Sequence, residues 1–460
     1  MKFLGVKQVK VDVNELLVGM FVSGLDRPWS QTPFPLQGFY VRDLEEIREL
    51  KAHCRHVYID MVKGKGPVET NLKTLAPRNG GVKQPLSRAG KSDRSKIDVG
   101  PLKIRRNAYG PVEQPLGSEI NNAKQLHSRV YHAVTEVVSQ IGNGDSVPIS
   151  ETKRYASDMV DSVLRNPDAF TWLTRVKEVD EHTYAHAVRS AVWAIVFGRH
   201  IGLSMNDLNT LAMGVLLKDV GKTRVNKKLL SRADLNQDEL KEFEKFIDHG
   251  VEILRTTPNV EPRMISVVKT HCERINGSGF PQHLRGDKIP LLGKIAGIVT
   301  YYDSVVNARG QAQPLAPSKA VAKLYEMRDI EFQEELVVEF IRAIGLYPTG
   351  TLVELSNGEI AVVVEQNFAR RLKPKVMVVM DALRERLDNP RLLDLAELEE
   401  RHKKMVESSR TLVDVEVVEI ARDLEPGKFD IDIAQIRDQY LFRQVGKTKK
   451  SLFSFLKRQK

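Results

Sequence analysis

Three short stretches set the architecture of this 460-residue chain: HTYAHAVRSA at 182–191, LLKDVGK at 216–222 and HCERINGSGFP at 271–281. Apolar residues recur at helical spacing in and around them, which is typical of amphipathic and buried helices. The pattern predicts the following helices: 150–165, 182–201, 205–218, 236–255, 260–272, 293–307 and 316–328. We therefore expect a mainly α-helical domain over residues 118–345, with histidine, aspartate and lysine placed at or near helix ends.

The region before this domain has a different pattern. Valines alternate over residues 9–13, a helical repeat covers 42–53, and an apolar strand pattern closes at 57–60. Residues 1–70 are therefore predicted to form a small α+β module. Residues 71–117 are rich in Lys, Arg, Pro and Gly, which predicts a basic flexible linker.

The region after the helical domain favours strands. An Asn-Gly turn inside 352–364 predicts a hairpin, and residues 376–380 predict a third strand. A charged helix is expected around 391–407, and the alternating valines of 413–417 predict one more strand. We therefore expect a small β-rich extension over residues 346–440.

Lys and Arg outnumber Asp and Glu by 70 to 60, which gives a formal net charge of +10. The tail over 441–460 concentrates this charge, with seven Lys/Arg and no acid from Arg443 to Lys460, around the apolar segment 452–456. A solvated tail is the simplest interpretation, but this pattern also suits an anionic membrane surface or an acidic partner. No zinc-finger, homeodomain or aromatic RNA-binding pattern accompanies the charge, so nucleic acid is not expected.

Composition restricts the class of protein. An apolar fraction of 42% with 28% charged residues is typical of a globular protein. The apolar run AVWAIV at 191–196 falls far short of the ~20 residues of a membrane span, and residues 1–4 lead into no signal-peptide pattern. Cys54 and Cys272 are too few for a disulfide framework. We expect a cytoplasmic protein and exclude secreted, membrane-spanning and fibrous classes.

Each motif residue has an ordinary explanation when it is taken alone. A single histidine such as His186 is usually a core or surface residue, and Asp219 before Gly221 fits a turn at a helix end. Together, their order and spacing resemble the HD-GYP family of cyclic-di-GMP phosphodiesterases. That family has a His on a first helix, H-D-x-G-K at a second, H-H-E-x-x-x-G-x-G-Y-P at a third, and a late Asp. The resemblance spans 180–345 and implies a helical fold of the HD superfamily.

The flanking modules extend the resemblance. GMFV at 19–22, with the nearby LDRPW and QGFYV segments, resembles the small domain that often precedes HD-GYP domains. IGLYPTGTLVEL at 344–355 resembles the extension that often follows them. Protein partners are expected through these N-terminal or C-terminal modules, and the sequence leaves the oligomeric state open.

The resemblance implies metal ligands at His186, Asp219 and His271 and catalytic roles for Asp219 and Lys222. Family members hold a cluster of two or three iron or manganese ions, which activates water and clamps phosphate oxygens. Several ligand positions carry other residues in this chain: Lys218, Phe246 (with His249 one helical turn away), Cys272 and Thr300. An ammonium ~4 Å from a divalent ion repels it by roughly 8 kcal/mol at an effective dielectric of about 20. No cofactor is expected, or at most iron or manganese in a remnant site.

The positions that would contact a nucleotide match the family better. They are Lys222, Arg274, Gly277, Gly279, Phe280 in place of the family's Tyr, and Arg309. Cationic side chains and loop amides suit a dianionic cyclic dinucleotide, so cyclic-di-GMP is the expected ligand. The alternative is that Lys222 and Arg309 simply pair with nearby acids.

Three functions remain open at this point. The first is a degenerate HD-GYP protein of bacterial cyclic-di-GMP signalling that acts as a receptor or scaffold with little or no hydrolysis. The second is an active phosphodiesterase that hydrolyses cyclic-di-GMP to pGpG or GMP with an unusual metal set. The third is an interaction protein whose pocket has no ligand.

Overall fold

The structure is a computed structural model, and it describes residues 8–27, 29, 32, 34, 38–41, 44–60, 102, 104–105, 108–110, 112–143, 149–174, 182–232, 234–308, 313–368, 370–408 and 417–441. The chain divides into two compact units, residues 1–96 and residues 97–460. Within the described residues, no helix has the length and apolar character needed to cross a membrane.

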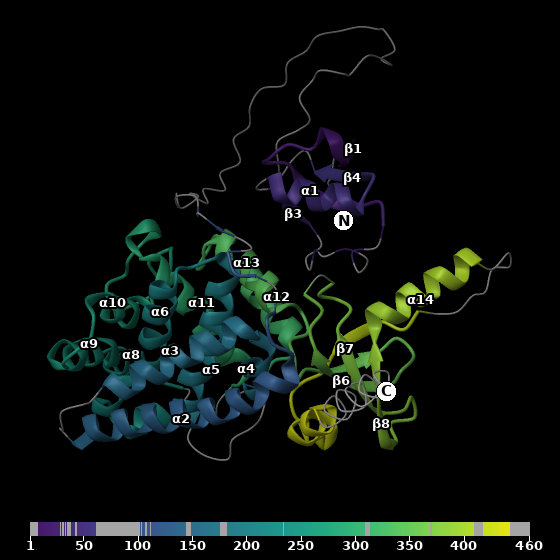
Figure 1. Ribbon diagram of the computed structural model, residues 1–460. Coiled ribbons are helices and arrows are strands. Elements are labelled where there is room, and N and C mark those ends of the chain that lie inside the picture. Colours follow the sequence, from purple (N-terminus) through teal and green to yellow (C-terminus); the bar gives the residue numbers. More distant parts are fainter. Residues whose placement is uncertain are drawn as a thin grey trace, which may run out of the picture. The chain divides into compact units, whose positions relative to one another are not determined.

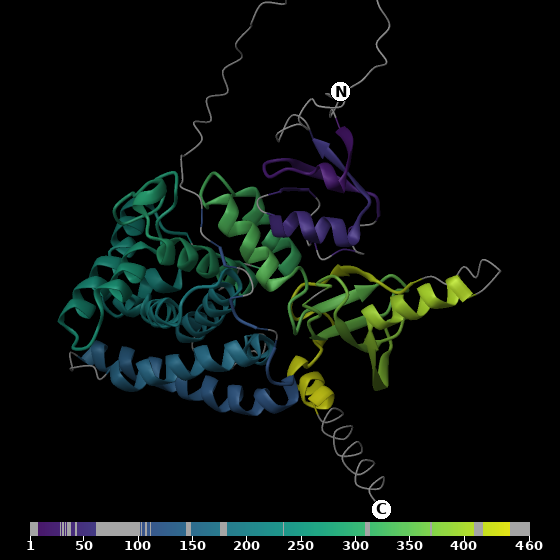
Figure 2. The ribbon, with the colours of Figure 1, turned by 45° about the horizontal axis from the view of Figure 1, so that its top comes forward.

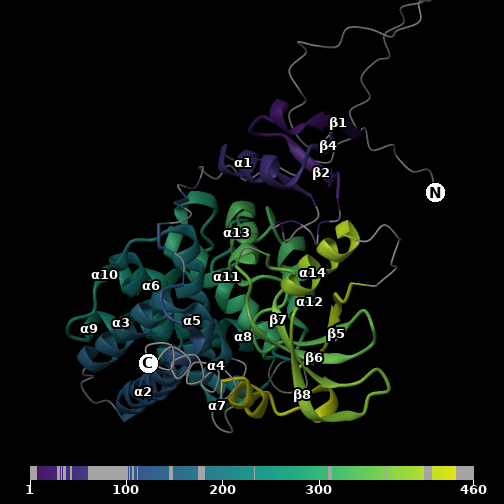
Figure 3. The ribbon, with the colours of Figure 1, turned by 45° about the vertical axis from the view of Figure 1, so that its right-hand side comes forward.

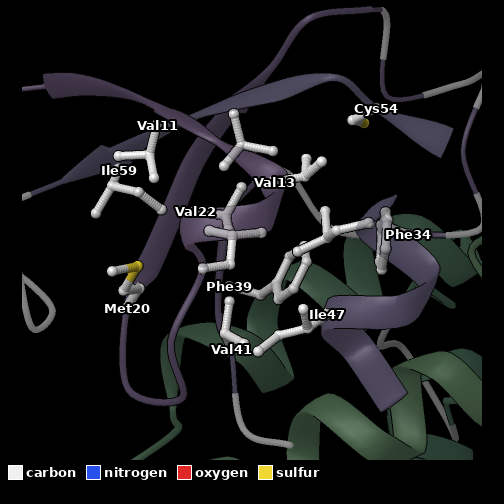
Figure 4. Close-up of a cluster of buried hydrophobic side chains, with 13 residues drawn as sticks. Val11, Val13, Met20, Val22, Phe34, Phe39, Val41, Ile47, Cys54 and Ile59 are labelled. Atoms are coloured by element: carbon white, nitrogen blue, oxygen red, sulfur yellow. The ribbon is translucent and has the colours of Figure 1, made fainter. Parts of the chain in front are cut away.

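The described residues of the N-terminal unit form a four-stranded antiparallel sheet with one α-helix. The strands are β1 (Gln8–Asp12), β2 (Phe21–Leu25), β3 (Phe39–Tyr40) and β4 (His56–Asp60), in the order β1-β4-β2-β3, and the helix is α1 (Leu44–His53). Val11 pairs with Val57 across β1 and β4, and both are buried in a core to which α1 contributes Ile47 (Figure 4). The predicted α+β module is confirmed, because alternating valines give the sheet one apolar face for the helix to cover.

The second unit begins with a helical domain. Its helices are α2 (Leu116–Asn143), α3 (Ile149–Arg165), α4 (Pro167–Leu173), α5 (His182–Ile201), α6 (Met205–Leu217), α7 (Lys227–Ser231), α8 (Gln237–Glu244), α9 (Phe246–Thr256), α10 (Pro262–Thr270), α11 (Leu291–Val306), α12 (Pro317–Glu326) and α13 (Glu334–Ile344). Helix α5 packs against α6, α11 and α13, and the long α2 lies alongside α3 (Figures 1 and 2). The buried run from Ala191 to Phe197 explains the central place of α5, since a helix that is apolar on all sides must be covered on all sides.

One predicted helix is divided in two. Residues 236–255 form α8, which starts with a capping box at Asn236, and α9, which starts at Phe246. A short 3-10 turn, η3 (Val220–Arg224), packs against α9, and a side chain on Gly221 would lie 2.0 Å from the Phe246 carbonyl oxygen. Apolar periodicity continues through both helices and therefore did not reveal the break.

The C-terminal extension is a five-stranded antiparallel sheet with the order β8-β7-β6-β5-β9 (Figure 3). Its elements are β5 (Leu352–Leu355), β6 (Ile360–Glu365), β7 (Lys375–Met380), β8 (Arg386–Asp394), α14 (Leu395–Ser408) and β9 (Ile420–Asp423). The predicted hairpin is β5–β6, with Gly358 in the left-handed region at φ 84°. The helix expected around 391–407 starts only at Leu395, because the preceding residues pair with β7 as edge strand β8. The strand predicted at 413–417 falls mostly outside the described residues.

Side chains of the helical domain anchor this extension. Trp172 on α4 donates from Nε1 to the Val364 carbonyl at 3.0 Å. Asp168, also on α4, accepts from Thr349 Oγ1 at 3.0 Å and from the Gln366 amide at 3.1 Å. Near the start of α12, the Ser318 amide donates to Asp423 at 2.7 Å. The sheet is therefore bonded to α4 and α12, the elements that come just before α5 and just after α11.

Part of the sequence assigned to the linker contacts the helical domain. The Arg105 amide donates to the Ile201 carbonyl at 3.0 Å, and the Tyr109 hydroxyl donates to the Leu203 carbonyl at 2.5 Å. Gly202 has φ 75°, and a side chain there would lie 2.2 Å from the Arg105 carbonyl oxygen. The described residues between 102 and 114 thus lie along the helical domain.

Candidate functional site

The three histidine and aspartate residues predicted from the motifs lie on three packed elements. His186 is on α5, Asp219 follows α6, and His271 is the C-cap of α10. They are 8%, 6% and 2% exposed. Helix α6 packs against both α5 and α10, and a side chain on Gly214 of α6 would lie 2.6 Å from Val267 of α10. Close packing at this glycine brings the motif residues into one buried cluster.

A lysine lies at the centre of this cluster. Lys218, which is 1% exposed, donates from Nζ to Asp219 Oδ2 in a buried ion pair. Lys222 Nζ lies 2.7 Å from the other oxygen, Oδ1. Burial alone would raise the pKa of Asp219, but the two ammonium groups hold it well below its usual value. Both carboxylate oxygens are therefore occupied by cations that belong to the chain.

The two histidines are neutral at pH 7 and are held by their Nδ1 atoms. His186 Nδ1 lies 2.7 Å from Asp303 Oδ2, and His271 Nδ1 lies 2.8 Å from the Val268 carbonyl. Burial and the Lys218 charge lower the pKa of His186 to about 4 and that of His271 to about 3. Because both partners are acceptors, Nδ1 carries the proton in each ring. This orientation, with a carboxylate or carbonyl behind the imidazole, is the one that metal-ligating histidines adopt.

Asp303 is a site residue that sequence reasoning missed. It is fully buried on α11, where it contacts His186, accepts from Arg189 Nε at 3.2 Å and accepts from Asn307 Nδ2 at 2.9 Å. Although burial would raise the pKa of Asp303, Arg189 and His186 lower it to about 2. The available signal was its spacing, one helical turn after Thr300 in TYYDSVVNARG.

The positions that depart from the family pattern supply no replacement ligands. Phe246 packs in an apolar cluster with Phe243 and Phe280. Burial raises the pKa of the Cys272 thiol to about 11, so it is not a thiolate at neutral pH. Thr300 Oγ1 is buried and has no hydrogen-bond partner among the residues that the structure describes. A neutral hydroxyl at this position is a weak ligand compared with the carboxylate that the family places there.

The residues present do not fit a metal cluster. Within the described part of the chain, no group of three or more His, Cys, Asp or Glu side chains is placed to hold a metal ion. Asp219 already binds two ammonium groups, and the neighbouring charge of Lys218 opposes any added cation. Iron or manganese chemistry therefore has no support in this geometry.

The loop of the third motif is built around a buried acid. Glu273, which is 4% exposed, accepts from the amides of Gln282 and Leu284 at 2.8 and 2.9 Å. A side chain on Gly279 would lie 2.3 Å from the Cys272 carbonyl oxygen, so the loop returns closely onto its own start. Gly277 has φ 80° and faces Arg285. These contacts explain why the loop requires glycine at 277 and 279.

The two described cations predicted to contact a nucleotide have partners within the chain. Lys222 binds Asp219 and lies 5.0 Å from the centre of the Phe246 ring. Arg274 stacks 4.7 Å from the centre of the Phe332 ring and lies 3.5 Å from Glu331. Arg309 lies outside the described residues. A ligand phosphate would therefore have to compete with Asp219 for Lys222.

Comparison with known families gives three matches along the chain. The HD domain family matches residues 175–336, and a domain of unknown function (DUF3391) matches residues 8–152. A KOW domain associated with the HD domain matches residues 352–402. The chain is thus an HD domain protein with both flanking domains, and the resemblance to the HD-GYP family is confirmed.

Curated relatives agree with this assignment. The chain is 28% identical over 81% of its length to cyclic di-GMP phosphodiesterase PA4108 from Pseudomonas aeruginosa, of which it covers 85%. It is also 28% identical over 35% of its length to 3'3'-cGAMP-specific phosphodiesterase 2 from Vibrio cholerae and over 42% to the response regulator RpfG, a cyclic di-GMP phosphodiesterase from Xanthomonas campestris. It covers 31% and 52% of those two proteins. The chain is therefore similar, over its HD domain, to proteins named as cyclic-dinucleotide phosphodiesterases.

Proposed function

We propose that this chain is a cytoplasmic, non-hydrolytic HD-GYP protein that acts as a receptor or scaffold in cyclic-di-GMP signalling. The observation that carries the proposal is the buried ion pair between Lys218 and Asp219. In a hydrolytic site a divalent ion would contact this aspartate and activate water. Here an ammonium group compensates the carboxylate, and an ammonium has no open coordination position at which water could be ionised.

The expected ligand is cyclic-di-GMP, which the PA4108 and RpfG relatives act on according to their names. Its phosphates would contact Lys222 and Arg309, while Arg274, Gly277, Gly279 and Phe280 shape the floor of the site. Binding would transfer Lys222 from Asp219 to a phosphate. Lys218 would then remain as the counter-charge of Asp219, so the aspartate would not be left unpaired.

A second candidate function is an active phosphodiesterase. The orientation of His186 and His271 favours it, because their Nδ1 contacts leave the Nε2 atoms as the unprotonated, ligand-competent nitrogens. For a metal to bind, Lys218 would have to move away from Asp219, and Phe246, Cys272 and Thr300 would still offer poor ligands. The receptor or scaffold function therefore remains the better supported proposal.

Elemental analysis and a hydrolysis assay on the purified full-length chain separate these candidates. We expect well below about one tightly bound transition metal per chain and no measurable hydrolysis of cyclic-di-GMP. Replacing Lys218→His together with Thr300→Asp should raise metal content before activity, because Phe246 still occupies one ligand position. Metal-dependent hydrolysis by the parent chain, abolished by Asp219→Ala, would establish the phosphodiesterase instead.

Calorimetric titration with cyclic-di-GMP then separates a receptor from a scaffold. Binding without hydrolysis supports the receptor. Neither binding nor hydrolysis, in a chain that folds normally by circular dichroism, supports a scaffold whose pocket has no ligand.

A further inference from the structure

A hollowed acidic surface lies on the C-terminal part of the second unit, and its described lining residues do not include His186, Asp219 or His271. One hollow of about 620 Å³ lies between the β8 residues 388–390 and the helical residues that follow 432. A second, of about 440 Å³, adjoins it and shares Asp432 and Ala434. Four exposed aspartates line the two hollows, which we call the acidic trough: Asp388, Asp430, Asp432 and Asp438.

The trough is acidic on balance, with four aspartates and fewer cations beside them. Lys428 is one of its lining residues, and Arg386 donates to the Asp430 carbonyl at 2.9 Å. Asp438 pairs with Arg437 at 2.9 Å, and Asp432 accepts from the Gln435 amide. Apolar side chains complete the wall of the second hollow: Leu352, Leu424, Ile431 and Ile433. The trough therefore suits an occupant with several cations and a few apolar side chains.

The chain itself contains such a segment directly after the trough. Gln439 is a lining residue, and residues 442–460 begin three positions later. This tail has seven Lys/Arg, no acid, and the apolar residues Leu452, Phe453, Phe455 and Leu456. An extended chain spans about 3.3 Å per residue, so 19 residues reach roughly 60 Å, well beyond what is needed to fold back.

We propose that the C-terminal tail, residues 442–460, docks in the acidic trough of its own chain. Covalent linkage gives a tail on so short a connection an effective concentration on the order of millimolar, which favours this site over a partner in solution. The cations of the tail match the aspartates of the trough, and the apolar side chains of the tail match its apolar wall. The inference is independent of the function proposed for the motif residues.

Docking would place the tail against the site's supporting residues. Asn307, which lines the second hollow, ends helix α11 and donates to Asp303 at 2.9 Å. Asp303 in turn holds His186. A tail bound in the trough would therefore contact the end of α11, the helix whose Asp303 positions His186.

Carbodiimide cross-linking of the full-length chain, followed by mass spectrometry, tests the proposal. The reagent joins a carboxylate to a lysine amine in contact with it. We expect links from Lys447, Lys449 or Lys450 to the trough aspartates, on the order of tenfold above links to control acids, because docking raises local concentration. Asp234 and Asp238 are matched controls, since their side chains are 91% and 96% exposed.

Charge-neutralising variants and added salt test whether the cross-links between tail and trough depend on electrostatic attraction. Neutralising the trough with Asp388→Asn, Asp430→Asn and Asp438→Asn should remove most of the remaining links to Asp432, whereas Asp234→Asn with Asp238→Asn should not change them. Raising salt from about 0.05 to about 0.5 M should weaken the links severalfold, because the Debye length falls below 5 Å. Circular dichroism confirms that each variant folds.

Each alternative occupant of the trough predicts a different cross-linking result. Links between isotopically light and heavy chains would show docking on a second copy and overturn the proposal. Loss of the links when phosphatidylglycerol vesicles are added at about 0.15 M salt would show that an anionic membrane is the preferred partner. Links spread equally over the trough and the control acids would also overturn it.

Discussion

Two buried carboxylates of the helical domain lie in opposite electrostatic environments. Asp219, 6% exposed, contacts the ammonium groups of Lys218 and Lys222, which hold its pKa well below the usual value. Asp168, 4% exposed, accepts hydrogen bonds from Thr349 and Gln366 at the junction with the C-terminal sheet. There burial, with a smaller contribution from Glu365, outweighs these bonds and the attraction of the Arg371 charge, and raises the pKa of Asp168 to about 6.

The difference shows how each acid tolerates burial. A buried carboxylate is best stabilised in its ionised form by a cation in direct contact, whereas neutral donors and a cation without a direct ion pair, such as Arg371 near Asp168, compensate only part of the desolvation cost. At Asp219 the chain supplies that charge from its own lysines. At Asp168 the carboxyl is close to neutral under mildly acidic conditions. The same residue type thus forms a buried ion pair in one region and a pH-sensitive contact between the helical domain and the C-terminal sheet in the other.

The largest expected effect is the loss of Asp219. Asp219→Ala leaves the buried ammonium of Lys218 unpaired, and breaking a buried pair in this way typically costs about 3–5 kcal/mol. We expect the free energy of unfolding, measured by denaturant titration, to fall by this amount. Removing both partners with Lys218→Met and Asp219→Asn should cost less than Asp219→Ala alone, because the only ammonium then left without its carboxylate is Lys222, whose side chain is partly exposed.

An Asp219→Ala chain that is as stable as the parent would contradict this picture. It would mean that the carboxylate is not compensating Lys218 in solution. A metal-loaded site would show a related pattern, with stability that falls when a chelator is added to the parent chain. The parent chain should instead be insensitive to chelator.

The second prediction uses the pKa of Asp168. A folded-state pKa of about 6, against 3.8 ordinarily, means that the folded state binds this proton more tightly. Stability should therefore rise as pH falls from 7 towards 4, and this contribution is lost again as pH rises through 6. Its upper limit is about 3 kcal/mol, since each pKa unit corresponds to about 1.4 kcal/mol.

Denaturant titrations at several pH values, on the parent chain and on Asp168→Asn, measure this contribution by difference. The difference between the two stabilities should change between pH 4 and 7 and level off outside that interval. A difference independent of pH would show that Asp168 is ionised throughout, as Asp219 is.

The third prediction concerns the second partner of Asp219. If cyclic-di-GMP binds, Lys222→Ala should weaken it by about 1.5–3 kcal/mol, or roughly 10- to 150-fold, the usual value of a contact to a charged group. Calorimetric titration measures the change, Lys222→Arg should restore part of the affinity, and Lys227→Ala is a matched control at an exposed lysine nearby. An unchanged affinity in Lys222→Ala would remove this residue from the binding site.

The smallest expected effect is at Thr349, which is fully buried and donates to Asp168. Thr349→Val removes one hydrogen bond and should cost about 1 kcal/mol near pH 7. Because that bond lowers the pKa of Asp168, its loss should also move the midpoint of the pH profile upward. Thr349→Ser, which keeps the hydroxyl, should leave the midpoint in place.

Local patterns predicted most of the secondary structure. Helix α5 coincides with the predicted range 182–201, and the β5–β6 hairpin lies where the Asn-Gly turn placed it. The errors fell where periodicity carries no boundary signal, as between α8 and α9 and at the start of α14. Edge strand β8 was missed because Arg386, Asp388 and Pro390 interrupt any alternation.

The candidate site was only partly accessible from the sequence. Motif spacing identified His186, Asp219 and His271, which the fold brings into one buried cluster. It also identified Lys218 as the substitution that opposes a metal. The pairing of Asp303 with His186, and of Arg274 with Phe332 and Glu331, joins residues far apart in the chain. No local pattern specifies such contacts.

The chain's own residue types thus established the family, the helical core and the substitutions in the metal motif, because periodicity and motif spacing are properties of short segments. Tertiary packing decided where each charge is compensated. In the sequence, Lys218 is a substitution that opposes metal binding, and in the fold it is the buried partner of Asp219. No sequence pattern marked Asp168, yet in the fold it connects the helical domain to the C-terminal sheet. The physical reason is that burial and opposite charge depend on which distant segments meet, and only the folded chain determines that.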